Sequence, residues 1–412
     1  MPSNRKKPYA LVIGLDSMNG IQTARILHKH GVPVIAIARD PHHYCCRTQV
    51  CEKIVNADTR SEAVIDTLAG LGPGLGQKAV VFPCDDMSVL QVSQNREKLK
   101  DWYHVVLPPV DVVELMMNKL QFYSFALEQS LPIPPTRFVT CGTEAEKAAA
   151  EMRFPCIVKP PISSVPRWES QSKRKAYRVT NGEELLFLYE KLGALCDTLI
   201  VQEWIPGPES NLYSCNCYFD DRSEALVTFV AKKLRQWPPE TGESCLGEEC
   251  RNDAVLHETV RLFKSVRHRG LGYLEMKQDS RTGEHFIIEP NIGRPTGRSA
   301  IAEAGGVELL YTMYCDALGW PLPDNLEQRY RGVKWIYLRR DLQSSLHYWR
   351  RGELGLKHWW RSLRGEKAYA MFSWRDPGPF VFDWLRSIQL YASREERQKR
   401  DFRHSLSYNR QA

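Results

Sequence analysis

An acidic hairpin in the second half of the chain carries the residues best suited to bind a metal ion. The segments 273–279 and 286–291 are typical of two strands joined by a turn that contains Gly. Glu289 and Asn291 are two residues apart and share one face of a strand, and Glu275 can lie beside them across the hairpin. Two carboxylates and an amide oxygen on one face favour a hard cation, Mg²⁺ or Mn²⁺, held together with substrate phosphates. The alternative, an exposed acidic face, is disfavoured by the apolar run before Glu289.

Two lysines that precede this hairpin could contact phosphate. Lys159 ends the apolar strand Pro155-Cys-Ile-Val-Lys159, directly before a polar loop over 160–175, and Lys119 lies in a predicted helix. A lysine at a strand end supplies a point charge for phosphate oxygens, and a polar loop can close over a triphosphate. Taken alone, each lysine is more simply a solvated surface charge.

A third element is the strand Leu199-Ile-Val-Gln-Glu203, which runs into a Pro-Gly hinge that ends at Glu209. Backbone groups of such a hinge can hydrogen-bond an adenine edge, and a carboxylate can accept ribose hydroxyls. Without the other elements, the simpler interpretation is a strand followed by an exposed acidic turn.

The elements that must position these residues fall into two patterns. Apolar runs and helical spacing alternate at first, with strands predicted over 9–14, 32–38 and 79–83 and helices over 21–28 and 62–69. This alternation indicates a parallel, doubly wound sheet. Its Gly14 to Gly20 turn can bind an anion at a helix N-terminus, but Gly-x-Gly-x-x-Gly is absent, which disfavours NAD.

A boundary at Leu107-Pro-Pro109 introduces the second pattern, an α+β body with antiparallel strands. A helix is predicted over 112–129, and polar stretches over 160–175 and 237–249 predict loops that act as lids or are disordered. After Pro323 the chain is aromatic and basic and predicts a helical extension.

The composition of the chain is typical of a globular protein and disfavours several other classes. The chain has 412 residues, 43% hydrophobic and 25% charged, which is ordinary for a globular protein of two or three domains. It lacks an apolar run of the roughly 18 residues that a bilayer requires, and its N-terminus is a poor secretory signal, so we expect a cytoplasmic protein. The twelve cysteines lack Cys-x-x-Cys spacing, which favours reduced thiols and gives no zinc site. No motif indicates a nucleic-acid partner.

Taken in order, these pieces resemble the ATP-grasp superfamily. The motifs are Asn118-Lys119, a strand ending in Val-Lys-Pro160, Gln-Glu-Trp-Ile-Pro-Gly-Pro-Glu209 and Glu-Pro-Asn291, after a Rossmann-like domain. That first domain is similar to the carboxylate–amine ligase branch that includes D-aspartate ligases, in Asn19-Gly20, Ala24-Arg25, Pro83-Cys-Asp-Asp86 and Leu107-Pro-Pro109. The resemblance covers roughly residues 8–320, and five weak motifs in this order are specific together.

The resemblance implies an α/β and α+β architecture. It consists of a pre-ATP-grasp Rossmann-like domain over 1–110, an ATP-grasp domain over 111–320 and a helical, basic, Trp-rich extension over 321–412. Within the ATP-grasp domain, a small lid subdomain would span about 137–205 and a large one about 206–320.

The resemblance also implies residue roles. Phosphates of ATP would contact Lys119 and Lys159; adenine would contact Gln202, Glu203, Trp204 and Ile205; ribose would contact Glu209; and Mg²⁺ (or Mn²⁺) would be bound by Glu275, Glu289 and Asn291. The loop over 160–175 would be a flexible lid.

The implied reaction is ATP-dependent amide formation: ATP phosphorylates a carboxylate, and an amine attacks the acyl phosphate, releasing ADP and phosphate. D-alanine–D-alanine ligases have an arginine where this chain has Tyr273, so the acyl phosphate must be stabilised from elsewhere. The candidates are Arg294 and Arg298, in a glycine-containing loop, and then Lys233 and Arg235. The alternatives are an arginine that braces the loop by pairing with an acid such as Glu303, and a basic strand end.

Alternatives to a ligase are another acyl-phosphate enzyme such as a carboxylase, and a nucleotide-binding scaffold without turnover. The expected partners are a small-molecule carboxylate and an amine, which the sequence does not name. The basic extension holds six of the eleven tryptophans. Its packing within the chain or against another subunit, as in a homodimer, is favoured over contact with an anionic membrane surface.

Overall fold

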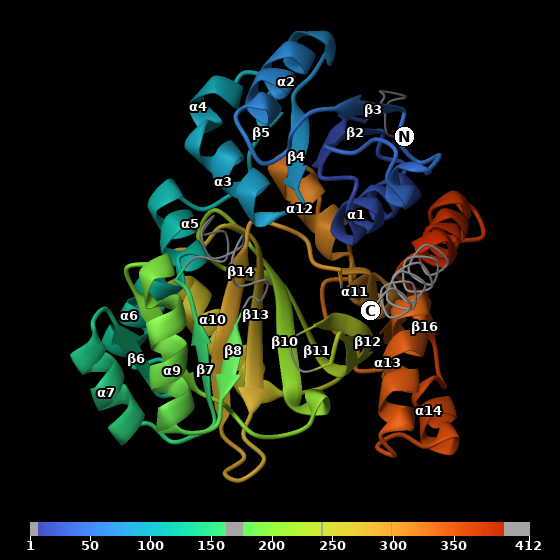
Figure 1. Ribbon diagram of the computed structural model, residues 1–412. Coiled ribbons are helices and arrows are strands. Elements are labelled where there is room, and N and C mark those ends of the chain that lie inside the picture. Colours follow the sequence, from blue (N-terminus) through green and yellow to red (C-terminus); the bar gives the residue numbers. More distant parts are fainter. Residues whose placement is uncertain (1–6, 162–175, 240–241, 298, 391–412) are drawn as a thin grey trace, which may run out of the picture.

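Three β-sheets with their helices make up the fold (Figure 1). The computed structural model describes residues 7–161, 176–239, 242–297 and 299–390. The N-terminal part is a five-stranded parallel sheet of order β3-β2-β1-β4-β5. Its elements are β1 (Ala10–Ile13), α1 (Met18–Lys29), β2 (Val34–Ala38), β3 (Lys53–Asn56), α2 (Ala63–Leu71), β4 (Ala79–Pro83), α3 (Asp86–Gln94), α4 (Arg96–Leu99) and β5 (Tyr103–His104). The predicted doubly wound sheet is confirmed.

A small four-stranded antiparallel sheet, of order β6-β9-β7-β8, follows. Its strands are β6 (Thr136–Val139), β7 (Cys156–Lys159), β8 (Tyr177–Val179) and β9 (Leu199–Glu203), and α7 (Gly142–Glu151) and α9 (Gly182–Leu192) pack on it. Apolar residues of both helices and the sheet form a separate core.

The large sheet has seven strands in the order β14-β13-β10-β11-β12-β15-β16. They are β10 (Leu212–Phe219), β11 (Ala225–Trp237), β12 (Glu243–Glu249), β13 (Gly270–Gln278), β14 (His285–Ile292), β15 (Lys334–Ile336) and β16 (Lys367–Tyr369). The accompanying helices are α5 (Val110–Met117), α6 (Lys119–Glu128), α10 (Asp253–Ser265), α11 (Ser299–Ala304), α12 (Leu309–Ala317), α13 (Leu338–Arg350) and α14 (Leu356–Ser362).

Two local predictions are wrong in detail. The single helix expected over 112–129 is interrupted at Asn118, whose extended backbone ends α5 and whose side chain accepts the N–H groups of Leu120 and Gln121 as the N-cap of α6. The polar loop expected over 237–249 is largely strand, because β12 pairs with β11 from Glu243 and buries Cys245 and Leu246.

The chain after Pro323 is helical as expected, but it also adds β15 and β16 to the large sheet. Trp335 on β15 is fully buried, and its indole donates to Gln22 of α1 at 3.1 Å. Arg25 of α1 pairs with Asp376 at 2.8 Å. These contacts join the C-terminal part to the N-terminal domain.

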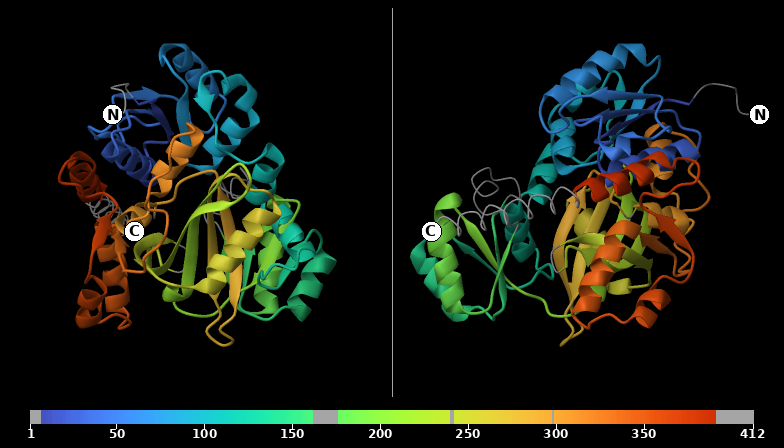
Figure 2. Two further views of the ribbon diagram at one scale, coloured as in Figure 1. Left: turned by 180° about the vertical axis from the view of Figure 1, so that it is seen from behind. Right: turned by 45° about the vertical axis from the view of Figure 1, so that its right-hand side comes forward.

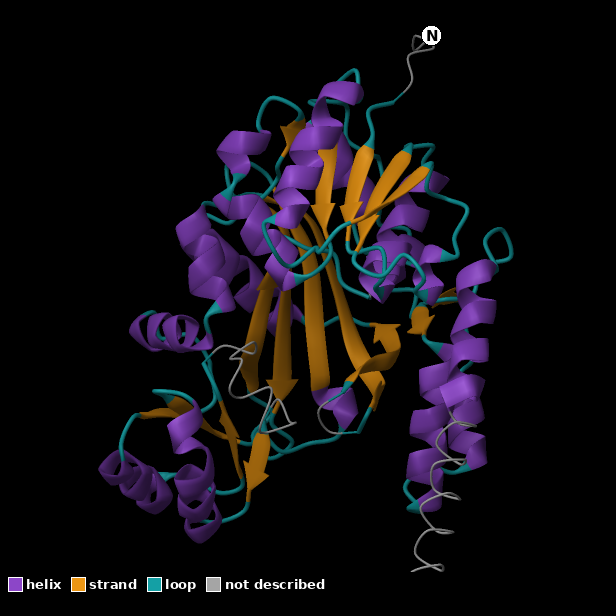
Figure 3. Ribbon diagram, turned by 45° about the horizontal axis from the view of Figure 1, so that its top comes forward, coloured by secondary structure: helices purple, strands orange, loops and turns teal. Residues whose placement is uncertain are grey.

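Three helices of the C-terminal part, α13, α14 and the helix over 378–390, stand at the edge of the molecule opposite the small sheet (Figure 2, left, and Figure 3). All twelve cysteines lie in the described part of the chain, and each is a free thiol, as predicted. Among the described residues, no helix combines the length and apolar character required to cross a bilayer.

Candidate active site

A cavity of about 730 Å³ lies between the small and large sheets. It is lined from the small sheet and the hinge that follows β9, and from β11, β13 and β14 of the large sheet. The sequence-predicted residues in its wall are Lys159, Gln202, Glu203, Trp204, Ile205, Glu209, Lys233, Arg235, Glu275 and Glu289. Residues from both sheets therefore meet around one space large enough for a nucleotide.

Lys159 is held at the end of β7 by two buried partners. Its ammonium group donates to the Tyr123 hydroxyl at 2.7 Å and to the Gln202 side-chain oxygen at 2.9 Å. Burial lowers the pKa of Lys159 to about 8, and the carboxylate of Glu289 opposes this shift. A partly desolvated cation at this position is well placed to attract an anionic ligand.

The hinge after β9 is fixed through its backbone. The N–H of Glu203 donates to Pro135 and the N–H of Trp204 donates to Pro155, each at 2.9 Å. These two donors are engaged, so an adenine edge would have to contact other backbone groups of the hinge. Arg178 lies over the Trp204 ring, with 5.0 Å between the guanidinium carbon and the ring centroid.

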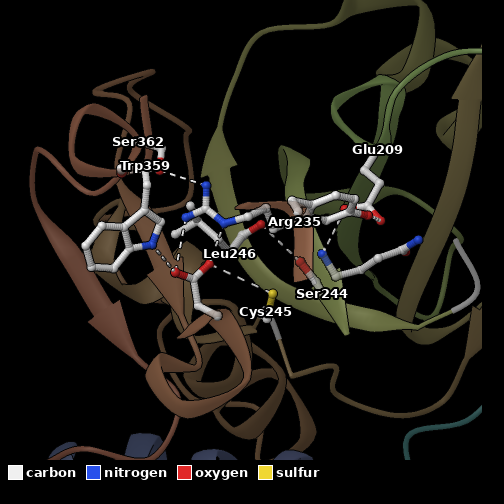
Figure 4. A network of polar contacts seen from close by, with 10 residues as sticks. Glu209, Arg235, Ser244, Cys245, Leu246, Trp359 and Ser362 are labelled. Atoms are coloured by element: carbon white, nitrogen blue, oxygen red, sulfur yellow. Dashed lines mark hydrogen bonds and ion pairs between the residues drawn. The ribbon is translucent and has the colours of Figure 1, made fainter. Parts of the chain in front are cut away.

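Glu209 begins the short helix that follows the hinge, and its carboxylate is oriented from two sides (Figure 4). One oxygen accepts the backbone N–H of Gln236 at 3.1 Å, and the other accepts the hydroxyl of Tyr348 from α13. Because Glu209 also lines the cavity and an ionised carboxylate can accept about four hydrogen bonds, it is placed to accept from a ribose hydroxyl.

The two predicted metal carboxylates lie together. Glu275 and Glu289 are direct partners in the β13–β14 register, as expected for the hairpin. The Tyr273 hydroxyl donates to Glu275 at 2.8 Å, and the Lys233 ammonium group is 3.7 Å from the same carboxylate. Burial raises the pKa of Glu275, Lys233 lowers it, and the neighbouring Glu289 raises it further.

Two half-buried carboxylates that face each other in neighbouring strands fit a site for a divalent cation, because a cation would relieve the repulsion through which Glu289 raises the pKa of Glu275. The described residues contain no group of three or more His, Cys, Asp or Glu side chains that could hold a metal by themselves. Glu275 and Glu289 could therefore hold Mg²⁺ only with further oxygen ligands, such as those of phosphates.

The structure gives Asn291 and Arg294 neighbours outside the cavity wall. The Arg294 guanidinium donates to the Asn291 side-chain oxygen and to Asp86, which begins α3 of the N-terminal domain. In the alternative interpretation, in which Arg294 braces the loop, the acid is therefore Asp86 and not Glu303, which lies 3.5 Å from His30. Arg294 thus links β14 to the first domain.

Of the remaining predicted residues, Lys119 contributes less than expected to the cavity, and Arg298 is not described. Lys119 is the first residue of α6, and its backbone N–H donates to Pro161 at 2.9 Å, but its side chain is not part of the cavity wall. Arg298 and residues 162–175 of the predicted lid lie outside the described part of the chain.

Arg235 points toward the C-terminal helices (Figure 4). Its guanidinium group donates to both oxygens of Asp341 on α13, at 2.7 and 3.1 Å, and to Ser362 at 2.8 Å. The indole of Trp359 donates to the same Asp341 carboxylate at 3.2 Å. With its charge satisfied in this way, Arg235 braces α13 against β11 and is a poorer substrate ligand than Lys233.

Sequence reasoning missed several residues of the site. Lys277 lines the cavity and donates to the carbonyls of Gly207 and Pro208 at 2.9 and 2.6 Å, which supports the turn before Glu209. Burial lowers the pKa of Lys277 to about 8. Its position two residues after Glu275 was an available signal. Tyr123, which contacts Lys159, and the cavity residues Tyr348, Glu353 and Leu354 had no local signal.

No family model matches the chain. The chain is 26% identical to the D-aspartate ligase of Enterococcus faecium over 238 residues. This aligned region covers 54% of this chain and 55% of the ligase. N5-carboxyaminoimidazole synthetase from Staphylococcus aureus superposes with a TM-score of 0.60 at 16% identity, over 80% of this chain and 82% of that one. L-amino acid ligase from Bacillus licheniformis superposes with a TM-score of 0.58 at 16% identity, over 81% of this chain and 79% of that one.

The chain spans about half the length of the curated ligase that it matches. Its sheets and helices have the same arrangement as the solved neighbours across most of their length. The chain is thus similar in sequence to a D-aspartate ligase and in fold to the solved synthetase and the L-amino acid ligase.

Proposed function

We propose that the protein is an ATP-dependent carboxylate–amine ligase that works through an acyl phosphate. The observation that carries the proposal is the convergence of Lys159, Lys233, Glu275 and Glu289 with the hinge on one cavity between two sheets. Similarity to D-aspartate ligase and to L-amino acid ligase supports this class of reaction. The Staphylococcus aureus synthetase has also been solved complexed with ADP, which supports a nucleotide in the corresponding cavity.

In the proposed reaction, a carboxylate oxygen of the acid attacks the γ-phosphorus, the bond to the β–γ bridging oxygen breaks, and ADP leaves. The amine nitrogen then attacks the acyl carbon, phosphate leaves, and the nitrogen loses a proton to solvent or phosphate. Lys159 and Lys233 would contact phosphate oxygens, and Glu209 would accept ribose hydroxyls. The chain contributes position and charge more than covalent chemistry.

Glu275 and Glu289 would hold Mg²⁺, which when bound neutralises phosphate charge as a Lewis acid. Asn291 would join them only if its oxygen exchanged the contact with Arg294. Arg294 stays a candidate for the acid substrate or its acyl phosphate, because it lies beside this strand and next to the N-terminal domain. The roles of Lys119 and Arg298 stay predictions.

A carboxylase is the second candidate, because solved neighbours include N5-carboxyaminoimidazole synthetase and a biotin carboxylase domain. In that case bicarbonate would be the acid. The ligase is preferred because the matched curated relatives include D-aspartate and D-alanine–D-alanine ligases.

The direct test is ADP and phosphate release from ATP with pools of organic acids, with hydroxylamine as the amine. Hydroxylamine converts an acyl phosphate to a hydroxamate, which mass spectrometry identifies. We expect acid-dependent hydroxamate and equal amounts of ADP and phosphate, both lost in Glu289→Gln. Release that requires bicarbonate alone would favour the carboxylase. ATP binding without acid-dependent ADP release would contradict both enzymes and favour a scaffold.

Tyr348→Phe is expected to weaken ATP binding without destroying the site. The change removes the hydroxyl that donates to one oxygen of Glu209 and keeps the Gln236 N–H on the other, so the carboxylate is less well oriented toward a ribose. A hydrogen bond to a charged group contributes roughly 1.5 kcal/mol, so we expect about a ten-fold higher KM for ATP with a smaller change in kcat.

The matched control is Tyr9→Phe, which removes a 2.7 Å Tyr–Glu hydrogen bond to Glu52, away from the cavity. Its KM for ATP should equal that of the wild type. An unchanged nucleotide affinity of Tyr348→Phe, measured by calorimetry, would separate α13 from the nucleotide site.

A further inference from the structure

The outer faces of α13, α14 and the helix over 378–390 carry an unusual share of exposed apolar side chains; we call these faces the tail surface. In the described part of the chain seventeen large apolar side chains are exposed, and twelve of them belong to residues 338–390. Trp360 is 62%, Leu356 70% and Trp374 87% exposed. Apolar side chains gathered in this way mark an interaction site rather than an ordinary protein surface.

These residues follow helical spacing, so they form stripes. Leu342, Leu346 and Trp349 lie at i, i+4 and i+7 of α13, and Leu356 and Trp360 lie at i and i+4 of α14. On the third helix the exposed apolar positions are 381, 382, 385, 388 and 390. The opposite face of α13 carries Asp341 and Tyr348, which contact β11 and the cavity. Each helix is thus anchored on one side and apolar on the other.

Charge is sorted across the same helices. Three of the five acids in residues 338–390, Asp341, Asp376 and Asp383, are buried, and each pairs with an arginine, whereas Glu353 and Glu366 are exposed. The exposed cations of residues 338–390 are Arg350, Arg351, Lys357, Arg361, Arg364, Arg375 and Arg386. The sequence after Tyr337 has sixteen Lys and Arg against eight Asp and Glu, a net +8, whereas the whole chain carries +7. Of this excess, +5 comes from residues 338–390, which include the three helices, because that range has ten Lys and Arg against five Asp and Glu.

The apolar stripes and the positive charge together indicate which kind of partner binds the tail surface. A second copy of the chain would bring two surfaces of the same positive sign together, which disfavours a homodimer through this face. Residues 391–412 are themselves basic and mostly polar, so their composition does not suit an apolar, basic surface. Tryptophans and aliphatic side chains mixed with arginines match a lipid surface with anionic headgroups, where indole rings favour the interface.

We infer that the tail surface binds the anionic face of a lipid bilayer, with its apolar stripes in the headgroup layer and its arginines on lipid phosphates. The protein would then lie on the membrane without spanning it. Because α13 also supplies Tyr348 to the cavity, the proposed ligase site would lie about one helix diameter from the lipid, roughly 10 Å. The inference does not depend on the reaction that the cavity catalyses.

The test is co-sedimentation of the full chain with vesicles of phosphatidylcholine and phosphatidylglycerol in about equal parts, at about 0.15 M salt, where surface charges are screened beyond about 8 Å. Deleting the chain after Pro323 would remove β15 and the buried Trp335, so point variants are used. We expect wild type to sediment with these vesicles and much less with phosphatidylcholine alone. Trp349→Ser/Trp360→Ser and Arg350→Glu/Arg361→Glu should each weaken binding about ten-fold or more.

Phe187→Ser is the matched control, because Phe187 is 64% exposed on α9, opposite the tail surface. It should bind vesicles like wild type, and all variants should keep the wild-type melting temperature. Absence of wild-type binding even at low salt would overturn the inference. Vesicle binding that does not change in the tryptophan variant would also overturn it, because the surface would then bind acidic groups through charge alone. A wild-type dimer in sedimentation velocity that only the tryptophan variant disrupts would likewise overturn it.

Discussion

Glu289→Gln is expected to abolish most turnover while the melting temperature stays the same or rises. The substitution keeps the shape of the side chain but removes one of the two facing carboxylates of the β13–β14 pair. Loss of a charge that would hold Mg²⁺ at the transferring phosphate should lower kcat on the order of 10²-fold or more. Because Glu289 raises the pKa of Glu275, its neutralisation also removes a repulsion within the fold.

This pair of outcomes separates a metal ligand from a structural residue, which would lose activity and stability together. The measurements are kcat at saturating ATP, the Mg²⁺ concentration for half-maximal activity, and thermal unfolding. The matched control is Glu248→Gln on β12, whose carboxylate pairs with Lys232 and Lys334 outside the cavity. Wild-type turnover in Glu289→Gln would remove the metal assignment from this hairpin.

Lys159→Ala is expected to lower ATP affinity and kcat/KM by about ten-fold or more. Lys159 is a desolvated cation in the wall of the cavity, and a charge-assisted contact with phosphate contributes roughly 1.5–3 kcal/mol. The measurement is ATP binding by calorimetry together with steady-state kinetics. Lys232→Ala is the matched control, because that lysine lies on β11 and pairs with Glu248. Wild-type affinity in Lys159→Ala would contradict the phosphate role.

The pH profile gives a second check on the same residue. The pKa of Lys159 is lowered to about 8, so its ammonium form, which attracts phosphate, is lost as the pH rises through about 8 in the free enzyme. The value of kcat/KM reports the free enzyme, so it should fall above that pH. In Lys159→Ala this fall should be smaller. A profile with the same alkaline fall in both proteins would assign it to another group, with Lys277 the first to test.

Much of the site could be predicted because its parts depend on neighbours close in sequence. The pairing of Glu275 with Glu289 follows from a hairpin and its two-residue alternation, and Lys159 ends a strand that is apolar by composition. The order of the hinge from Gln202 to Glu209 is equally local. The alternation of side chains along a strand and the position of its last residue do not depend on how the strands pack. These residues therefore reach the cavity as expected.

The direction of Arg235 could not be predicted in this way. Strict alternation would place Lys233 and Arg235 on one face, but the β11–β12 register shifts on both sides of Arg235. Such an irregularity turns side chains away from the simple pattern. Lys233 therefore lies beside Glu275, while Arg235 reaches Asp341, 106 residues away in the chain.

The sequence alone determined which strands form, which carboxylates face each other and where a lysine ends a strand, because these follow from periods of two and from short turns. Only the tertiary structure decided that Tyr123 holds Lys159, that Tyr348 holds Glu209 across 139 residues, and that Arg294 contacts Asp86 of another domain. A contact between distant segments depends on how the sheets and helices pack and on which polar groups must be paired once buried. No local pattern encodes that arrangement.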